Sequence, residues 1–136
     1  MLEIYQKTIT EAVKFQGIGL HSGKISTATV LPGLVDQGIV FKRTDIKKNN
    51  IINAKYSNVT SAKLCTTLEN EQGVKVSTVE HLLAALYLAG IDNALIEIDC
   101  DEIPIMDGSA KNFLEVFDSK KIKSQSKKRK YLKVKK

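Results

Sequence analysis

The strongest constraint on the fold is an apolar segment in the middle of the chain, Thr78–Ala89. Its larger apolar side chains recur at the i, i+3, i+4 and i+7 positions of one helix face, at Val79, Leu82, Leu83 and Leu86. Alanines and a further leucine fill half of the remaining positions, which leaves little polar surface. The pattern predicts a helix that other elements cover on most sides.

Both ends of this helix carry local signals. Ser77 suits the N-cap position, and Glu80 follows three residues later, which is the spacing of a capping box. Gly90 stands where a left-handed residue closes a helix. A second helix is expected to begin near Ser109, after a turn at Asp107-Gly108. Its apolar residues are Phe113, Leu114, Val116 and Phe117.

Short strands are predicted on both sides of the long helix. β-Branched and apolar residues between turn residues indicate them at Ile25–Leu31, Gly38–Phe41 and Ala94–Asp99. A hairpin is expected where Cys65–Leu68 and Val74–Val76 flank a polar loop that ends in glycine. Strands followed by helix, strand and helix predict an α+β domain. We expect a two-layer sandwich in which a mainly antiparallel sheet carries helices on one face.

Charge divides the chain into two parts. The 136 residues suit one domain, but the net charge of +6 is concentrated at one end. Ten of the 21 Lys and Arg residues lie between Lys120 and Lys136, where no acid occurs, so residues 1–119 hold 11 bases against 15 acids. We expect a domain over residues 1–119. Residues 120–136 are then a basic linker, through residue 130, and the first strand of a missing second domain, at Tyr131–Val134.

Several classes of protein are excluded by composition. No apolar run approaches the roughly 18 residues of a transmembrane segment, and the N-terminus lacks the features of a secretory signal. We therefore expect a soluble, cytoplasmic protein. The two cysteines, Cys65 and Cys100, form no CxxC pair, which excludes a zinc ribbon, and each is explained as a small buried hydrophobe. Binding to nucleic acid is not expected, because it would rest on the basic tail alone.

The sequence contains only two histidines, and one of them follows a glutamate. Glu80 and His81 lie in the first turn of the predicted helix, where the macrodipole favours an ionised glutamate and a neutral imidazole. A neutral imidazole is the form that binds a metal, and a carboxylate beside it can act as a general base. Capping by Glu80 and a surface position for His81 explain the same residues without chemistry. The dipeptide alone leaves both interpretations open.

The other histidine, His21, lies in a glycine-rich segment, Gly17–Gly23. Three glycines in seven residues predict a tight turn or a close approach of the backbone to another group. The spacing is not GxGxxG and does not indicate a nucleotide-binding loop. An exposed histidine in a strand connection and a functional loop residue are both consistent with the pattern.

Three segments together resemble a known family. They are GIGLHSG at Gly17–Gly23, STVEHLL at Ser77–Leu83, and GIDN at Gly90–Asn93 followed by PIMDGSA at Pro104–Ala110. Their order and spacing resemble the zinc-dependent UDP-3-O-acyl-N-acetylglucosamine deacetylases of lipid A biosynthesis, from about Lys7 to about Ser119. The resemblance implies the first of two similar α+β domains, with the active site between them.

The resemblance also implies a cofactor, a substrate and roles for particular residues. The cofactor is Zn²⁺, and the substrate is a UDP-sugar that carries an acyl chain. His81 is implied as a zinc ligand and Glu80 as the general base that takes a proton from the attacking water. The implied substrate contacts, in the loop that lines the cleft and in a segment beside the acyl passage, are Leu20, His21, Leu64 and Cys65.

One departure from the family is large. The family's other two zinc ligands, a His and an Asp, belong to the second domain and have no counterpart here. Catalytic zinc usually takes three protein ligands, so we expect the chain alone to bind zinc weakly and to be inactive. A surface that faces a missing carboxy-terminal domain should be apolar, which predicts self-association. The alternative is a non-catalytic module whose basic tail binds an anionic partner.

Overall fold

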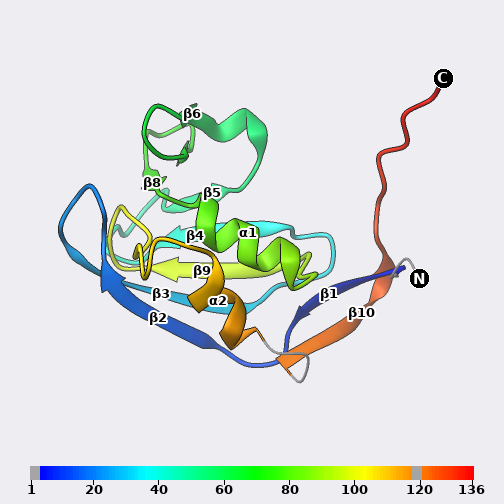
Figure 1. The fold of residues 1–136 in the computed structure, drawn as a ribbon. Coiled ribbons are helices and arrows are strands. Elements are labelled where there is room, and N and C mark those ends of the chain that lie inside the picture. Colours follow the sequence, from blue (N-terminus) through cyan, green and yellow to red (C-terminus); the bar gives the residue numbers. More distant parts are fainter. Residues whose placement is uncertain (1–3, 118–120) are drawn as a thin grey trace.

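The computed structural model describes residues 4–117 and 121–136 (Figure 1). Strands make up most of the regular structure, and a 3₁₀ turn occupies Tyr56–Asn58. The strands and helices are β1 Tyr5–Ile9, β2 Val13–Ile18, β3 Ile25–Pro32, β4 Ile39–Arg43, β5 Ile51–Asn53, β6 Val59–Ser61, β7 Thr67–Glu69, β8 Lys75–Ser77, α1 Glu80–Leu88, β9 Ala94–Ile98, α2 Lys111–Val116 and β10 Ile122–Lys128.

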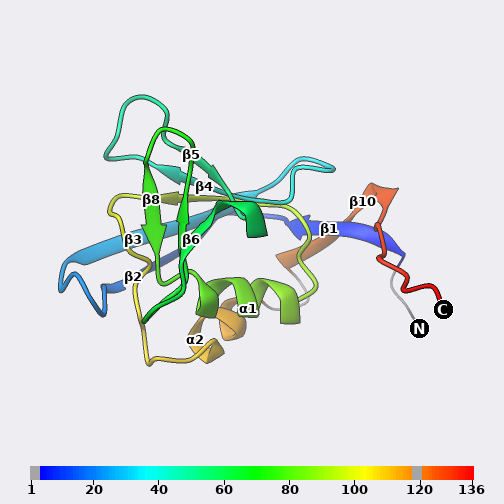
Figure 2. The same cartoon turned by 90° about the horizontal axis from the view of Figure 1, so that it is seen from above.

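The main layer is a five-stranded sheet with the order β2-β3-β9-β4-β5. Its neighbouring strands are antiparallel except for β4 and β9, which run parallel. Both helices cover the same face of this sheet (Figure 2). A three-stranded antiparallel sheet, β6-β7-β8, lies beside the β5 edge, and β1 pairs with β10 in a separate ribbon. The predicted two-layer α+β class, mainly antiparallel with helices on one face, is confirmed.

The predicted strands form because their apolar residues alternate along the sheet. In β9, Ala94, Ile96 and Ile98 are fully buried, whereas the residues between them are half-buried. Strand β3 alternates in the same way. The predicted hairpin is also present, since β7 and β8 pair antiparallel across a turn that ends at Gly73. These strand predictions are confirmed to within a few residues.

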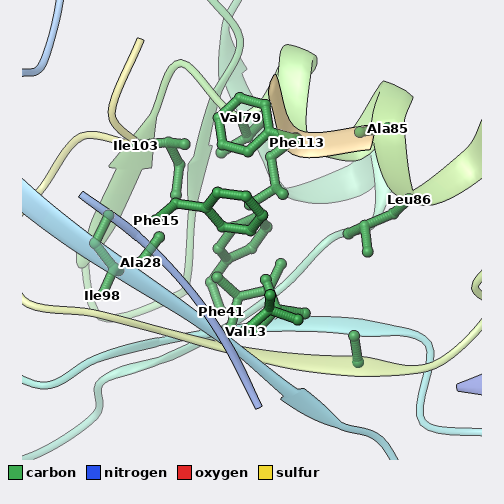
Figure 3. Close-up of a cluster of buried hydrophobic side chains, with 14 of the residues drawn as sticks. Val13, Phe15, Ala28, Phe41, Val79, Ala85, Leu86, Ile98, Ile103 and Phe113 are labelled. Atoms are coloured by element: carbon green, nitrogen blue, oxygen red, sulfur yellow. The ribbon is translucent and has the colours of Figure 1, made fainter. Parts of the chain in front are cut away.

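The core lies between the five-stranded sheet and the helices (Figure 3). Phe15 of β2 meets Phe113 of α2 edge to face, with 4.9 Å between ring centroids, and Phe117 lies 5.7 Å from Phe15. The predicted stripe of α1 reaches this core, because Val79, Leu82 and Leu86 are buried and Leu83 packs against them. The core therefore fixes the orientation of α1 on the sheet.

The beginning of α1 differs from the predicted capping box. Ser77 is the last residue of β8 and pairs with Thr67, so it cannot serve as the N-cap. Thr78 adopts a left-handed backbone conformation, with φ of 57°, and Val79 takes the N-cap position without a side-chain hydrogen bond. Strand β8 thus includes Ser77, and α1 begins at Glu80 rather than directly after Ser77. The carboxylate of Glu80 is consequently available for another partner.

The end of α1 agrees with the prediction. Gly90 has φ of 73°, its N–H donates to the Tyr87 carbonyl, and the Ile91 N–H donates to the Leu86 carbonyl. This pair of bonds is a Schellman motif. The expectation that α1 is covered on most sides is wrong, because Tyr87 and Leu88 are 84% and 65% exposed. Only one face of α1 rests on the sheet.

The predicted linker is partly wrong. Residues 122–128 form β10, which pairs antiparallel with β1, and Tyr131–Val134 forms no strand. Side-chain bonds from Gln125 hold β10 in place, with Nε2 donating to the Gly33 carbonyl (2.9 Å) and Oε1 accepting from Asn93 Nδ2 (2.7 Å). Strand β10 is polar over most of its length, so it has no alternation of apolar residues from which a strand could be predicted. The structure contains no helix, among the residues it describes, with the length and hydropathy of a membrane span.

Candidate functional site

The glycine-rich segment forms the connection between β2 and β3, at residues 19–24. The Gly19 N–H donates to the Lys24 carbonyl (2.9 Å), and the Gly23 N–H donates back to the Gly19 carbonyl (3.0 Å). Gly23 has φ of 67°, a conformation that glycine adopts without steric cost. The tight strand connection is confirmed, and it presents Leu20 and His21 with exposed side chains.

A buried carboxylate anchors this loop from below. Glu102 is 2% exposed, and its Oε2 accepts a hydrogen bond from the Ser22 N–H at 2.7 Å. The His21 N–H donates to both oxygens, at 3.0 and 3.2 Å. On the opposite side, the Thr78 hydroxyl donates to Oε1 at 2.7 Å. Glu102 therefore bonds both to the β2–β3 loop and to the residue that turns the chain into α1.

These contacts keep Glu102 ionised. Burial raises the pKa of Glu102. The hydrogen bonds from the His21 and Ser22 N–H groups and from the Thr78 hydroxyl together lower the pKa by more than burial raises it. The pKa of the Glu102 carboxyl therefore lies below its ordinary value of 4.5. A buried ionised carboxylate with several donors is a strong attachment point, because each charge-assisted bond exceeds a neutral one in strength.

A small hollow lies next to Glu102. It has a volume of about 270 Å³. Its lining residues come from four separate segments: His21, Ser22, Cys65, Ser77, Asp101 and Glu102. Two of the predicted substrate-contact residues, His21 and Cys65, therefore meet here. The other two, Leu20 and Leu64, are 60% and 86% exposed and are not part of the lining.

Both cysteines are free and half-buried, so their interpretation as buried hydrophobes is wrong. Cys65 faces the hollow, and its Sγ lies 3.7 Å from the Thr67 hydroxyl. Cys100 donates to Asp101 Oδ1 at 3.3 Å. Burial, followed by the bond to Asp101, raises the pKa of the Cys100 thiol. Both thiols therefore have polar neighbours and lie outside the hydrophobic core.

Glu80 begins α1, and its carboxylate is held in one place. Its Oε2 accepts a hydrogen bond from the Thr66 backbone N–H at 3.1 Å. Thr66 directly follows Cys65, so this bond ties the first turn of α1 to the segment that borders the hollow. The side chain of Glu80 is half-buried and has one oxygen that this bond does not use.

His81 follows on the same helical turn and is also half-buried. Its Nδ1 atom is buried and has no hydrogen-bond partner. A buried nitrogen without a hydrogen-bond partner is unusual in proteins, and a bound metal ion is one group that would satisfy it. Imidazole nitrogens are common zinc ligands, so this side chain fits the role of a single metal ligand.

A complete metal site needs more ligands than the described residues bring together. Within 4–117 and 121–136, the structure shows no group of three or more His, Cys, Asp or Glu side chains that could hold a metal ion. His81 therefore fits zinc as one ligand of a set.

Sequence reasoning did not find Glu102 or Thr78. Glu102 lies outside the predicted strands and helices, and its donors are about 80 positions away in the loop and 24 positions away at Thr78. No local pattern encodes such contacts. A usable signal was the acid itself, placed directly before the apolar Ile103-Pro104 pair, since buried carboxylates need dedicated donors.

Comparison with known proteins identifies the family of this chain. The sequence model of the family described as LpxC, UDP-3-O-acyl N-acetylglycosamine deacetylase, matches residues 6–136. The chain belongs to this family. A UDP-3-O-acyl-N-acetylglucosamine deacetylase of Shewanella oneidensis is 49% identical over 132 residues, and one of Shewanella baltica is 48% identical over the same length. The family resemblance predicted from the three sequence segments is thereby confirmed.

The match to these relatives is asymmetric. It covers 97% of this chain but only 43% of each Shewanella protein. The chain therefore spans less than half the length of the curated LpxC relatives that it matches.

Proposed function

We propose that this chain supplies one half of the active site of a zinc-dependent deacetylase. Its substrate is UDP-3-O-acyl-N-acetylglucosamine, its pathway is lipid A biosynthesis, and its location is the cytoplasm. The chain alone is inactive. The observation that carries the proposal is the Glu80-His81 pair at the first turn of α1, with an anchored carboxylate and a buried unpaired imidazole nitrogen, in a chain of this family.

Glu80 is the general base in this proposal. The bond from the Thr66 N–H fixes one carboxylate oxygen, which leaves the other to accept a proton. A base held by its neighbours is oriented before the substrate arrives, which lowers the entropic part of the barrier.

His81 is one zinc ligand in this proposal, and further ligands come from a second domain. Bound zinc would polarise the acetamide carbonyl of the substrate. Water adds to that carbonyl carbon while Glu80 takes one of its protons. The C–N bond then breaks, acetate leaves, and the sugar nitrogen takes a proton to become a free amine.

The substrate lies along the side of the domain that carries the hollow. His21 and Cys65 line this hollow, and Leu20 and Leu64 extend from the same two segments into solvent. Exposed leucines beside a polar hollow suit a molecule with a polar sugar and an acyl chain. We assign Leu20, His21, Leu64 and Cys65 as substrate contacts on this basis.

A companion domain accounts for the apolar surface of α1. Tyr87 and Leu88 are largely exposed at the end of a helix whose other face is in the core. Adjacent exposed apolar side chains mark surfaces that a partner covers. The coverage of 43% of the Shewanella relatives fits a partner that lies elsewhere in those proteins. Without it, the same surface favours self-association of this chain.

The alternative of a non-catalytic module with a polyanion-binding tail is not favoured. Lys127 pairs with Asp36 (2.7 Å), and Arg129 pairs with Asp92 (2.9 Å). Part of the positive charge of the tail is therefore neutralised within the domain.

The proposal is tested with a chimera in which residues 1–136 replace the matching part of the Shewanella oneidensis relative. We expect the chimera to release acetate from UDP-3-O-acyl-N-acetylglucosamine and the 136-residue chain to release none. Glu80→Gln and His81→Ala should each abolish release in the chimera, whereas Glu71→Gln, in the exposed turn between β7 and β8, should not. Turnover by the short chain, or a chimera indifferent to Glu80→Gln, would refute the proposal.

A further inference from the structure

We infer that Glu102 is a positioning residue that sets the β2–β3 loop against the first turn of α1. The inference rests on the proposed function, because the loop carries the substrate contacts Leu20 and His21 and the helix carries Glu80 and His81. Glu102 borders the hollow but is only 2% exposed, and both of its carboxylate oxygens already accept hydrogen bonds from His21, Ser22 or Thr78. It acts through the two segments that donate to it.

The backbone around Glu102 is itself fixed. The Ser77 N–H donates to the Asp101 carbonyl (2.9 Å), and the Ile103 N–H donates to the Ser77 carbonyl (3.0 Å). These two bonds form a parallel bridge that places Glu102 opposite Ser77, at the end of β8. The carboxylate therefore projects from a rigid base, and its position sets that of its donors.

On the loop side, the Glu102 carboxylate accepts hydrogen bonds from backbone N–H groups, as a carbonyl oxygen would in a strand or helix. The consecutive N–H groups of His21 and Ser22 point at Glu102 and have no backbone acceptor among the hydrogen bonds of the loop. Gly19 packs so closely that an added Cβ would overlap both Oε2 of Glu102 and the Ser22 hydroxyl. The loop thus has one position relative to Glu102.

On the helix side, the bond holds an unfavourable backbone conformation. Thr78 is β-branched and has φ of 57°, which such residues rarely adopt, and it lies two positions before Glu80. Its side chain is 2% exposed, so no solvent replaces Glu102 as the acceptor of its hydroxyl. Strain of this kind persists only where the surrounding contacts determine the conformation. The direction in which α1 starts therefore depends on the Thr78–Glu102 bond.

Three substitutions separate these effects. Glu102→Met keeps the length of the side chain and removes both acceptors. Glu102→Gln keeps both connections, because its amide oxygen can accept from Ser22 and its amide group can donate to the Thr78 hydroxyl oxygen. Thr78→Val removes only the helix-side bond and keeps the β-branched shape. A purely structural role would lower the yield of folded protein. It would leave kcat and KM of the folded fraction unchanged.

The chimera described above gives the kinetic readout, with rates normalised to folded protein. Glu102→Met should lower kcat by about tenfold to a hundredfold and raise KM severalfold, because both segments shift. Thr78→Val should lower kcat by about tenfold and leave KM within about twofold, because the loop stays anchored. Glu102→Gln should restore most of both values. Unchanged kcat and KM in Glu102→Met, with an active parent chimera, would overturn the inference.

Amide hydrogen exchange in the 136-residue chain gives a readout that needs no activity. Glu102→Met should remove the protection of the His21 and Ser22 amides, Glu102→Gln should retain it, and Thr78→Val should retain it while shifting the resonances of Glu80 and His81. Full protection in Glu102→Met overturns the inference whatever the chimera does. An inactive parent chimera refutes the proposed function instead, and the exchange data then decide whether Glu102 couples the two segments.

Discussion

The carboxylate of Glu80 accepts a hydrogen bond from the backbone N–H of Thr66, 3.1 Å away. This bond replaces the capping box, in which Glu80 would have reached back to Ser77. It directs a charged side chain from the helix toward the segment that carries Cys65. A residue that sequence analysis explains by helix capping therefore has a different partner and a different orientation.

The first prediction separates the chemistry of Glu80 from its structural bond. Gln at position 80 retains an oxygen that can accept from the Thr66 N–H, so Glu80→Gln should change the free energy of unfolding by less than about 1 kcal/mol. The same variant should lower kcat of the chimera by at least about a hundredfold, because an amide does not take up a proton. Denaturant unfolding and acetate release measure the two effects. A parallel loss of stability and activity would indicate that Glu80 acts only through the fold.

The second prediction concerns the space above Glu102. Gly19→Ala places a methyl group against Glu102 Oε2 and the Ser22 hydroxyl, and both must move. We expect a loss of about 1–3 kcal/mol in the free energy of unfolding, typical of overpacking at a rigid site. Ser22→Ala is the matched control, since it removes the Ser22 hydroxyl and adds no atom beside Glu102. It should lower the free energy of unfolding by less than Gly19→Ala does. Equal stability of Gly19→Ala and the parent would show that the loop is free to move.

The third prediction concerns acid sensitivity. The pKa of Glu102 is lower in the folded chain than its ordinary value of 4.5, so the folded state favours the ionised form. This contribution to stability is complete above pH 4.5 and is lost as the pH falls through the folded-state pKa. Glu102→Gln should therefore be less stable than the parent at neutral pH, with the difference shrinking below pH 4.5.

Denaturant unfolding of both proteins between pH 3 and pH 7 measures this difference. Asp45 also has a lowered pKa, chiefly through its hydrogen bond to Arg43, and it remains in both proteins. Comparison of the two curves therefore isolates Glu102. A constant difference across the whole pH range would contradict the assignment.

The fourth prediction concerns zinc. His81 offers one imidazole, and the described part of the chain contains no cluster of three metal-binding side chains. The 136-residue chain should therefore bind Zn²⁺ at least about a hundredfold more weakly than the chimera, which restores the other ligands. Competition with a chromogenic chelator measures both constants, and His81→Ala should weaken binding in the chimera. Equal affinities would show that this chain holds a complete site.

Most of the central layer could be predicted from the sequence, because its information is local. The alternation of Ala94, Ile96 and Ile98, the stripe of α1 and the glycine that ends it each depend on neighbouring residues. The predicted pairing of Glu80 with His81 on one turn is likewise a local property. The resemblance of three short segments added the family, which the match over residues 6–136 confirms.

The features that could not be predicted depend on distant partners. Strand β10 is held in place by hydrogen bonds of Gln125 with Gly33 and Asn93, not by an alternating pattern of apolar side chains. Glu102 takes its role from donors at His21, Ser22 and Thr78. Patterns in a single sequence do not indicate such long-range contacts, because each of these residues taken alone is also compatible with an exposed position.

The last prediction tests whether the basic strand β10 belongs to the domain. Asp92 accepts from Arg129 Nε at 2.9 Å and from the Lys7 N–H at 2.7 Å, and Arg129 Nη2 donates to the Gly90 carbonyl at 2.6 Å. These bonds join the end of α1 to both strands of the β1–β10 ribbon. Because both side chains of the pair are half-buried and Arg129 makes charge-assisted hydrogen bonds, Arg129→Met should cost about 1–3 kcal/mol of unfolding free energy.

Lys135→Met, in the exposed segment after β10, removes the same charge and is the matched control. It should leave stability within about 0.5 kcal/mol of the parent. Equal effects of the two substitutions would show that the tail contributes only its charge, as expected of a solvated polyanion-binding segment. A selective loss in Arg129→Met would place β10 within the cooperative unit of the domain.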